Sequence, residues 1–458
     1  MNYPKVLILG QTFNDFSGGG ITLTNLFCEW PNELLAVLSY PFLIHNSLTD
    51  VCNNYYQIGK EELIWKFPFS IVKQKFPSGK VEIRSNGRIP ILKEAKSIRH
   101  NISSTILTPL LKWSGLVHCV SFIQLSAKLK DWLLKFNPDI LYIQISNRES
   151  INFAFELIDY LKIPSVIHMM DDWPSTISSK GLFKRYWQRK IDREFRQLIG
   201  KIDLHLSISE AMSEAYQSRY HTSFKVFHNP VELKEFDNKL NVKKTGLSGF
   251  RILYLGRIGT ANSQSIIQFA RFISKYEPDG VKIEFDIYTK DIDTSYTRKL
   301  SKLHNVNVRP SIQHDEIPRI LVSYDLLLLP LDFTKLGLAF SRYSIPTKAS
   351  EYMMSGTPVL VFAPAETAIS RFFATNKCGH CLSTNKLIEL KESLDLLIGD
   401  KEYRLRIGGR AILIAKQMFD ARVVRNNFMS LLSTLHEIKS HSSTHLLSCW
   451  LMMFIIII

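Results

Sequence analysis

The sequence predicts an α/β protein made of two Rossmann-like, doubly wound halves, each built on a mostly parallel sheet. Short apolar runs alternate with amphipathic helical stretches along most of the 458 residues. Some runs are continuously apolar, as at 6–9, which is typical of strands covered on both faces. A polar, highly charged stretch at 233–249 interrupts the alternation, which restarts at residue 250. We therefore expect two domains joined by a linker.

The expected elements follow in order along the chain. In the first half, strands are predicted at 5–10, 140–145, 164–170, 204–209 and 224–229, with helices at 152–161, 182–199 and 209–219. In the second half, strands are predicted at 251–256, 281–289, 305–310, 325–331 and 357–362, with helices at 263–275, 347–355, 385–398, 402–417 and 420–435. The resulting domains are 1–232 and 250–435, with the linker at 233–249 and a tail at 436–458.

Charge and composition narrow the class of protein. Lys and Arg number 57 against 42 Asp and Glu, which gives a formal net charge of +15. This surplus favours nucleic acids, acidic lipid headgroups or phosphorylated small molecules as partners, without choosing among them. Hydrophobic residues at 45% and charged residues at 22% exclude a disordered chain and a polytopic membrane protein. Scattered cysteines and the absence of a signal-peptide cleavage site predict a reducing, cytoplasmic compartment.

The segment 446–458 is almost entirely apolar. Its 13 residues fall short of the roughly 20 that a membrane-spanning helix needs. It can be interpreted as a membrane-dipping anchor, as a non-native tail or as a segment packed on another chain.

A glycine run follows the first predicted strand. Gly18, Gly19 and Gly20 precede a helix that is expected to begin near Ile21. Glycines at a helix N-terminus let backbone amides approach an anion, and the helix dipole favours negative charge there. The run is neither a dinucleotide fingerprint nor an ATP-binding P-loop. A flexible strand-to-helix turn is the alternative.

The sharpest signal lies in the second half, at 346–360. A helix is expected to begin near Thr347, whose side chain can cap it, and to end at Gly356. Lys348 adds positive charge where a diphosphate would bind, and Glu351 lies one turn further on the same face. Its carboxylate could accept hydrogen bonds from both hydroxyls of a ribose. The alternative is a surface Lys–Glu pair on an ordinary helix.

This segment, PTKASEYMMSGTPVL, resembles the donor-binding segment of GT-B glycosyltransferases, specifically the family 4-like group with the pattern P-x-K-x-x-E-Y-x-x-x-G-x-P-V. Four further matches stand in the family's order, at 168–176, 206–236, 253–259 and 324–331. The resemblance implies two Rossmann-like domains facing each other across a cleft and retention of anomeric configuration. No metal or cofactor is expected, because Arg257, Lys348 and the helix dipole can supply the positive charge that the leaving nucleoside diphosphate needs.

The resemblance also assigns the donor site. Arg257, which follows a glycine after the first strand of the second domain, would reach the donor diphosphate together with Thr347 and Lys348, and Glu351 would bind the ribose. Gly19 and Gly20 would line the donor site from the first domain.

Two departures from the family pattern affect the donor site. Many members carry a second glutamate eight positions before the one matched by Glu351, but Tyr343 stands there. The usual lysine five positions after the arginine is replaced by Asn262. The identity of the sugar is therefore left open.

A third departure affects catalysis. In the first-domain segment HMMDDWPST, the histidine often considered catalytic falls on Met170, and His168 lies two residues earlier on the same face of the strand. We expect Asp171 or Asp172 to orient the acceptor hydroxyl, with His168 as the competing candidate. The alternative is that both aspartates cap a loop and that His168 belongs to the core.

Two motifs imitate other chemistry. Cys378 and Cys381 have the spacing of a redox or zinc motif but lack its context, and a zinc site would need two further ligands. Asp291 and Asp293 imitate the metal-binding DxD of a different glycosyltransferase fold. No metal site is predicted.

Basic residues with interleaved aromatic residues occur at 180–201, and further basic residues at 93–130. A basic amphipathic helix suits an anionic membrane surface. A solvated face whose apolar stripe packs on the core is the equal alternative for 180–201. Both stretches lie where GT-B enzymes take their acceptor, which fits an acceptor carried on a polyprenyl diphosphate or another glycolipid.

The sequence thus predicts a hexose-transferring glycosyltransferase. It would move a sugar from a UDP- or GDP-type donor to a glycan or lipid-linked glycan in cell-surface polysaccharide synthesis (lipopolysaccharide, capsule or exopolysaccharide). It would work in the cytoplasm, with attachment to the inner face of the membrane as an option. A nucleotide-sugar 2-epimerase of the same architecture and a non-catalytic, basic anion- or nucleic-acid-binding protein are the alternatives. RNA- and DNA-binding signatures are absent, which disfavours nucleic acid as a partner.

Overall fold

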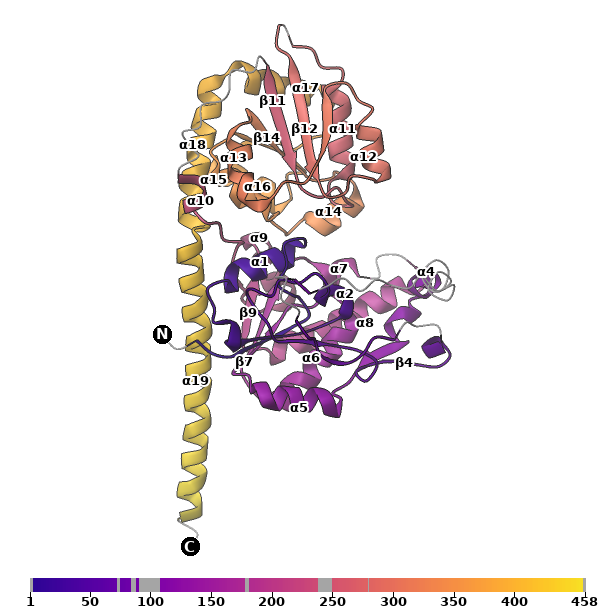
Figure 1. Cartoon of the computed structure of the whole chain (residues 1–458), viewed down its shortest axis with the longest axis vertical. Helices are drawn as coiled ribbons and strands as arrows, with labels where there is room; N and C mark the ends of the chain where they lie inside the picture. The colour runs from indigo at the N-terminus through magenta and orange to yellow at the C-terminus, as the bar shows by residue number, and fades with distance from the viewer. Residues whose placement is uncertain are drawn as a thin grey trace. The chain divides into compact units, whose positions relative to one another are not determined.

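The computed structural model describes residues 3–71, 75–83, 88–89, 108–177, 181–237, 249–278 and 280–455. The chain divides into two compact units (Figure 1). Unit 1 comprises Met1–Ser207, Tyr216–Phe227 and Arg425–Ile458, and unit 2 comprises Ile208–Ala215 and His228–Val424. The predicted domains, 1–232 and 250–435, are each one continuous segment, whereas each compact unit combines segments from different parts of the chain. The predicted limits stay a prediction for the functional domains. Most of the predicted linker lies at 238–248, outside the described residues.

Within the described part of unit 1, eight strands form one sheet, which is parallel except for its last strand. In spatial order these are β10 (Lys225–Val226), β9 (Leu204–Ser207), β8 (Ser165–Met169), β7 (Ile140–Ile143), β1 (Val6–Leu9), β2 (Leu35–Ser39), β3 (Tyr55–Gln57) and β5 (Gly79–Lys80). The chain proceeds outward from β1 in one direction through β2 and later in the other direction from β7. The order therefore reverses between β1 and β7, and ligands of such sheets bind beyond the carboxyl ends of the strands at this point.

Helices cover both faces of this sheet. They are α1 (Gly18–Phe27), α2 (Pro41–Ile44), α4 (Thr108–Ser114), α5 (Ala127–Phe136), α6 (Arg148–Leu161), α7 (Trp173–Thr176), α8 (Lys184–Lys201) and parts of α9 (Glu210–Tyr220) and α19 (Ala421–Ile455). A separate antiparallel pair is formed by β4 (Leu63–Trp65) and β6 (Ser121–Ile123).

The distant α19 completes the core of unit 1. Phe428 packs edge-on against Phe27 of α1, with ring centroids 5.1 Å apart, and against Tyr142 of β7. Arg425, which is buried, donates to the carbonyl oxygen of Asn25 at 2.7 Å and pairs with Glu29 at 2.9 Å. The aromatic contacts bury apolar area that α1 would otherwise expose.

In unit 2, the described strands form a six-stranded, fully parallel sheet. In spatial order these are β13 (Val306–Pro310), β12 (Ile283–Thr289), β11 (Phe250–Leu255), β14 (Leu326–Pro330), β15 (Val359–Phe362) and β16 (His380–Leu382). The helices are α10 (Lys234–Asp237), α11 (Ser263–Ile273), α12 (Ser295–Leu300), α13 (Ile317–Val322), α14 (Lys335–Ser341), α15 (Lys348–Met354), α16 (Ala368–Asn376), α17 (Leu387–Gly399) and α18 (Lys401–Met418). The strand order reverses between β11 and β14.

Alternating side chains divide the core of unit 2 into two layers. Ile252 and Tyr254 of β11 belong to one buried cluster, while Leu253 between them belongs to the other. Such strands must be apolar on both faces, which is why they appear in the sequence as continuous apolar runs. The predicted α/β class with two doubly wound sheets is confirmed.

The predicted end of the last helix is wrong. The helix predicted at 420–435 continues to Ile455, through most of the segment that we expected to be a separate tail. Among the described residues, no helix has both the length and the apolar character that crossing a bilayer requires.

Candidate functional site

Gly256 links β11 to Arg257 in a backbone conformation that favours glycine. Its φ is +147°, and a Cβ atom at this position would lie 2.1 Å from Nζ of Lys348. Glycine therefore lets the Lys348 ammonium lie directly beside the backbone at the carboxyl end of the sheet.

The hydroxyl of Tyr254 joins three parts of this site. It accepts hydrogen bonds from Nζ of Lys348 at 3.0 Å and from Nδ2 of Asn262 at 2.8 Å, and it donates to the carbonyl oxygen of Arg257 at 2.5 Å. Nζ of Lys348 also lies 4.2 Å from the centroid of the Tyr254 ring. The start of α15 and the loop that carries Arg257 are thus held together by one buried phenol.

Asn262, which replaces the family's lysine, stabilises the same loop. Its Oδ1 accepts from the backbone N–H of Gly259 at 2.9 Å, and its Nδ2 donates to the carbonyl oxygen of Arg257 at 3.0 Å. The side chain thus binds the loop and brings no charge to it.

Lys348 and Glu351 share a half-buried environment on α15. Loss of hydration lowers the pKa of Lys348 to about 7, although the neighbouring Glu351 carboxylate raises it. Burial raises the pKa of Glu351, whose side chain is 17% exposed, while His314 and Lys348 pull it down. Nε2 of His314 lies 3.9 Å from Oε1 of Glu351. The Lys348 ammonium and the Glu351 carboxylate have both lost contacts with water, and a polar ligand could replace these contacts.

Arg257 extends from this loop toward solvent. Its side chain is 67% exposed and makes an ion pair with Asp291 at 3.4 Å. Oδ2 of Asp291 also accepts from the backbone N–H of Ile258 at 3.2 Å. Asp293 is almost fully exposed and lies near Arg298. In the described residues, no cluster of three or more His, Cys, Asp or Glu side chains could hold a metal ion.

Thr347 does not play the predicted capping role. It precedes α15, but its own φ of −53° and ψ of −33° are helical, and in the described structure its side chain makes no capping hydrogen bond. A capping residue normally has extended backbone angles, which turn its side chain toward the helix amides. Its carbonyl oxygen accepts from Nδ2 of Asn229 at 3.3 Å instead.

In unit 1, the glycine run forms the first turn of α1. The helix begins at Gly18, so its predicted beginning near Ile21 is wrong, and Ser17 caps it by accepting from the N–H of Gly20. Ser17 explains the earlier beginning, because its side chain accepts a hydrogen bond from an N–H of the first turn that has no partner within the helix. A Cβ on Gly20 would lie 2.1 Å from the Asn14 side chain, and a Cβ on Gly19 would lie 3.4 Å from Oε1 of Gln144.

Gln144 is a candidate residue that our reading of the sequence missed. It directly follows β7, and its backbone N–H donates to Leu9 of β1 at 3.0 Å, which places it where the strand order reverses. Its side chain is 9% exposed, and within the described residues neither amide atom has a hydrogen-bond partner. A glutamine at the end of an apolar strand, as in the sequence ILYIQI, was the available signal.

The two adjacent aspartates after β8 differ in their surroundings. Asp172 is buried, and its carboxylate accepts two hydrogen bonds from Arg219 at 2.7 and 2.9 Å, one from Tyr216 and one from Ser175. This bidentate pair ties α9 to the loop after β8. Asp171 is exposed as a residue, although lost hydration raises the pKa of its carboxyl, which also accepts a hydrogen bond from the backbone of Trp173. Of the two residues, Asp171 is the more accessible.

His168 lies inside unit 1. It is 1% exposed, and its Nδ1 is 2.5 Å from the hydroxyl of Tyr142 on the neighbouring strand. Tyr142 in turn packs against Phe27 and Phe428. These contacts favour the alternative interpretation of His168 as a core histidine.

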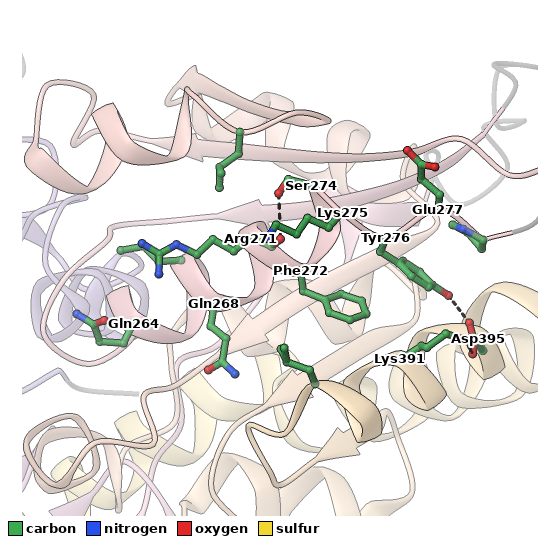
Figure 2. A pocket seen from close by; sticks show the side chains of 14 residues that line it. Gln264, Gln268, Arg271, Phe272, Ser274, Lys275, Tyr276, Glu277, Lys391 and Asp395 are labelled. Atoms are coloured by element: carbon green, nitrogen blue, oxygen red, sulfur yellow. Dashed lines mark hydrogen bonds and ion pairs between the residues drawn. The ribbon is translucent and has the colours of Figure 1, made fainter.

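A wide groove of about 1340 Å³ lies elsewhere in unit 2 (Figure 2). Its described lining comes mainly from α11, α17 and the turn at 274–278, and does not include Arg257, Lys348 or Glu351. Figure 2 shows Tyr276 pointing toward Asp395, which accepts its hydroxyl hydrogen bond and pairs with Lys391 at 2.7 Å. The groove is therefore separate from the candidate site.

Two doubly wound parallel sheets, each with its strand order reversing near the candidate residues, define the GT-B fold of glycosyltransferases. The resemblance found in the sequence is thereby confirmed at the level of the fold, and solved structures agree. HepE from Anabaena, in complex with UDP and glucose, matches with a TM-score of 0.58 and 14% identity, over 94% of this chain and 100% of that one.

Sucrose-phosphate synthase from Thermosynechococcus elongatus matches with a TM-score of 0.59 and 12% identity, over 95% of this chain and 100% of that one. The trehalose 6-phosphate synthase from Burkholderia multivorans matches with a TM-score of 0.57 and 10% identity, over 97% of this chain and 98% of that one. At these identities the likeness shows the fold. No protein-family model and no curated protein sequence matches the chain.

Proposed function

We propose that this protein is a glycosyltransferase that takes a hexose from a nucleoside-diphosphate sugar of the UDP or GDP type. The arrangement of Lys348, Tyr254 and Arg257 at the carboxyl end of the unit 2 sheet is the observation that carries this proposal. The GT-B fold supports it, as does HepE, whose solved complexes contain UDP and UDP-glucose.

The donor diphosphate would bind between the two cations. Arg257 is exposed and can exchange its long, 3.4 Å pair with Asp291 for phosphate oxygens. Lys348 would take up a proton when the diphosphate arrives, because its pKa is near 7 in the empty site. Together they would stabilise the negative charge that develops on the leaving nucleoside diphosphate, without a metal ion.

Glu351 would hold the nucleoside. Its half-buried carboxylate lies one turn after Lys348 and can accept hydrogen bonds from two adjacent ribose hydroxyls. Thr347 would contribute through its position at the start of α15 and not through its side chain. The raised pKa of Glu351 is then offset in the complex, since hydrogen bonds to the charged form favour ionisation.

Unit 1 would supply the groups near the reacting carbon. We assign Asp171 to the acceptor hydroxyl, with Asp172 holding the loop in position through Arg219. Gly19 would present its amide to the sugar or its phosphate. The N–H of buried Gly20 already donates to Ser17, so Gly20 would contribute by letting the first turn of α1 pack against Asn14. His168 is the weaker candidate because its ring is enclosed beside Tyr142.

The setting is proposed from the resemblance. The acceptor would be a glycan or lipid-linked glycan of a cell-surface polysaccharide, transfer would retain the anomeric configuration, and the enzyme would work at the cytoplasmic face of the membrane.

Nucleotide binding tests the class of protein directly. Thermal unfolding of the full chain would be followed with UDP, GDP, UDP-glucose and GDP-mannose, and one nucleotide series should raise the midpoint. Glu351→Ala should abolish this rise while folding normally, whereas Glu392→Ala, an exposed change on α17, should keep it. If no nucleotide changed the midpoint of thermal unfolding, the proposal would be contradicted. Conversion of the nucleotide sugar to its epimer in the absence of an acceptor would favour the epimerase.

A further inference from the structure

Exposed apolar side chains gather on three short segments of unit 1, at 63–71, 108–124 and 181–191. Each side chain is more than a third exposed, and Phe67 reaches 80%. The exposed set comprises Phe67, Ile71, Leu110, Trp113, Leu116, Phe122, Leu182, Phe183 and Tyr186. We name these three segments the apolar tip. Soluble proteins seldom expose so many large apolar groups together unless they contact a partner.

Backbone contacts make the three segments neighbours. The first two meet in the antiparallel pairing of β4 with β6, which the N–H of Lys66 extends by donating to Val120 at 2.8 Å. The N–H of Leu182 donates to the carbonyl oxygen of Trp113 at 2.8 Å, which joins the third segment to the second. Figure 1 shows α4 and β4 on the same side of unit 1. The exposed side chains therefore belong to one region of the surface.

The charge of the apolar tip has one sign. The described side chains of its segments include five basic residues, and the three segments contain neither Asp nor Glu. The basic residues are Lys66, Lys184, Arg185, Arg189 and Lys190. Aromatic side chains beside Lys and Arg are the composition that places a protein surface among the headgroups of an anionic bilayer.

The body of α8 does not provide such a surface. Its apolar stripe, which includes Trp187, Ile191 and Phe195, is buried inside unit 1. Phe195, for example, packs against Trp173 with ring centroids 5.4 Å apart. The alternative interpretation of 180–201, an apolar stripe on the core, therefore describes this helix. What remains exposed is the turn before it, with Leu182 and Phe183, and Tyr186 in its first turn.

We propose that the apolar tip inserts into the headgroup layer of a lipid bilayer that contains anionic lipids. The exposed aromatic and aliphatic groups would leave water, and the basic residues would pair with lipid phosphates. A second copy of the chain fits less well, because a symmetric contact would bring the basic residues of both copies together, and among their described side chains only Lys190 has an acidic partner, Glu194 at 3.4 Å. The proposal locates the membrane attachment of the proposed function but does not require sugar transfer, so either can fail without the other.

Vesicle flotation of the full chain tests this inference. The protein should float with vesicles of phosphatidylcholine and phosphatidylglycerol and bind weakly to phosphatidylcholine alone. The double variant Phe67→Ser, Leu182→Ser should reduce binding about tenfold or more, with an unchanged thermal midpoint. Leu134→Ser is the matched control, because Leu134 is 70% exposed on α5 of the same unit.

Charge variants test the electrostatic part. Lys184→Glu with Arg185→Glu should abolish the preference for anionic vesicles, whereas Arg193→Glu, further along α8, should leave it. Equal loss in the Leu134 and Arg193 controls would overturn the proposal. Undiminished binding by the Phe67, Leu182 variant would overturn it too, and would assign membrane contact to another segment, such as 446–458. A dimer in light scattering that this variant dissociates would assign the surface to a second copy instead.

Discussion

Nζ of Lys348 and the hydroxyl of Tyr254 lie 3.0 Å apart, and the ammonium also faces the Tyr254 ring at 4.2 Å from its centroid. The cation is thus held beside Gly256 by a neutral phenol and an aromatic face. Neither partner carries a compensating negative charge, so Lys348 keeps its capacity to pair with an incoming anion.

The pH dependence of donor binding follows from this environment. A lysine with a pKa of about 7 is charged below that pH and neutral above it. Because a diphosphate binds the charged form, affinity for UDP-glucose should be constant below about pH 6 and fall up to tenfold per unit above about pH 7. Isothermal titration calorimetry between pH 6 and 9 measures this, together with uptake of up to one proton at pH 8.

Lys348→Arg provides the control for that profile, since a guanidinium stays charged across the range. Its affinity should be lower but independent of pH. A flat profile for the unchanged protein would show that Lys348 does not lose its charge or does not meet the diphosphate.

Gly256→Ala should damage the site, and Gly259→Ala should not. At Gly256 the positive φ strains any side chain, and the new Cβ meets Nζ of Lys348 at 2.1 Å. At Gly259 no atom of the described structure lies within 4 Å of such a Cβ. We expect Gly256→Ala to lower the free energy of unfolding by about 1–2 kcal/mol and to weaken UDP-glucose binding. Urea denaturation and calorimetry would show this, and equal behaviour of the two variants would contradict it.

The two aspartates after β8 should separate stability from activity. Asp172→Asn weakens a bidentate pair and leaves Arg219 without its counter-charge, so the free energy of unfolding should fall by about 3 kcal/mol. Asp171→Asn replaces a carboxyl whose charged form is disfavoured by lost hydration with a neutral amide that can still accept from the backbone of Trp173. It should leave stability nearly unchanged while slowing sugar transfer. Urea denaturation of both variants decides the first point, and a transfer assay at constant folded fraction decides the second. Normal transfer by Asp171→Asn would remove this residue from the reaction.

Gln144→Leu should stabilise the empty protein. The carboxamide is buried, and among the described residues neither of its polar atoms is bonded, whereas Leu has similar volume and no polar group. Removing this penalty should raise the free energy of unfolding by about 1–2 kcal/mol. If Gln144 contacts the sugar or the acceptor, transfer should fall at the same time, which would give the variant higher stability and lower activity. Loss of stability would show instead that the side chain is already satisfied, for example by water.

The sequence predicted the central strands well because their burial on both faces leaves an apolar run without polar interruption. It missed β3, at Tyr55–Gln57, which has only three residues, and also β2, at Leu35–Ser39, although its five residues are all buried and mostly apolar like those of β1. The length of α19 was underestimated although neither Gly nor Pro occurs after Gly409. We placed the end of the helix where the composition changes, although the stretch beyond it contains no residue that stops a helix.

The candidate site was predicted only in part, because some of its residues are recognisable only from their contacts in the folded protein. Motif spacing located Lys348, Glu351 and Arg257, since these residues stand next to strand ends or on one helix face. The hydroxyl of Tyr254 could not be assigned, because a tyrosine within a buried strand looks like any core residue until its neighbours are known. The error at Thr347 has a local cause, as its backbone is already helical.

The contribution of α19 to unit 1 affects how the chain folds during synthesis. Phe428 and Arg425, which pack on α1, are translated after the whole of unit 2. Until they emerge from the ribosome, Phe27 and Tyr142 lack an aromatic partner that covers them in the finished protein. Unit 1, most of which is translated first, is therefore completed last. A nascent chain stopped before residue 425 should expose an apolar surface on unit 1 that chaperones bind.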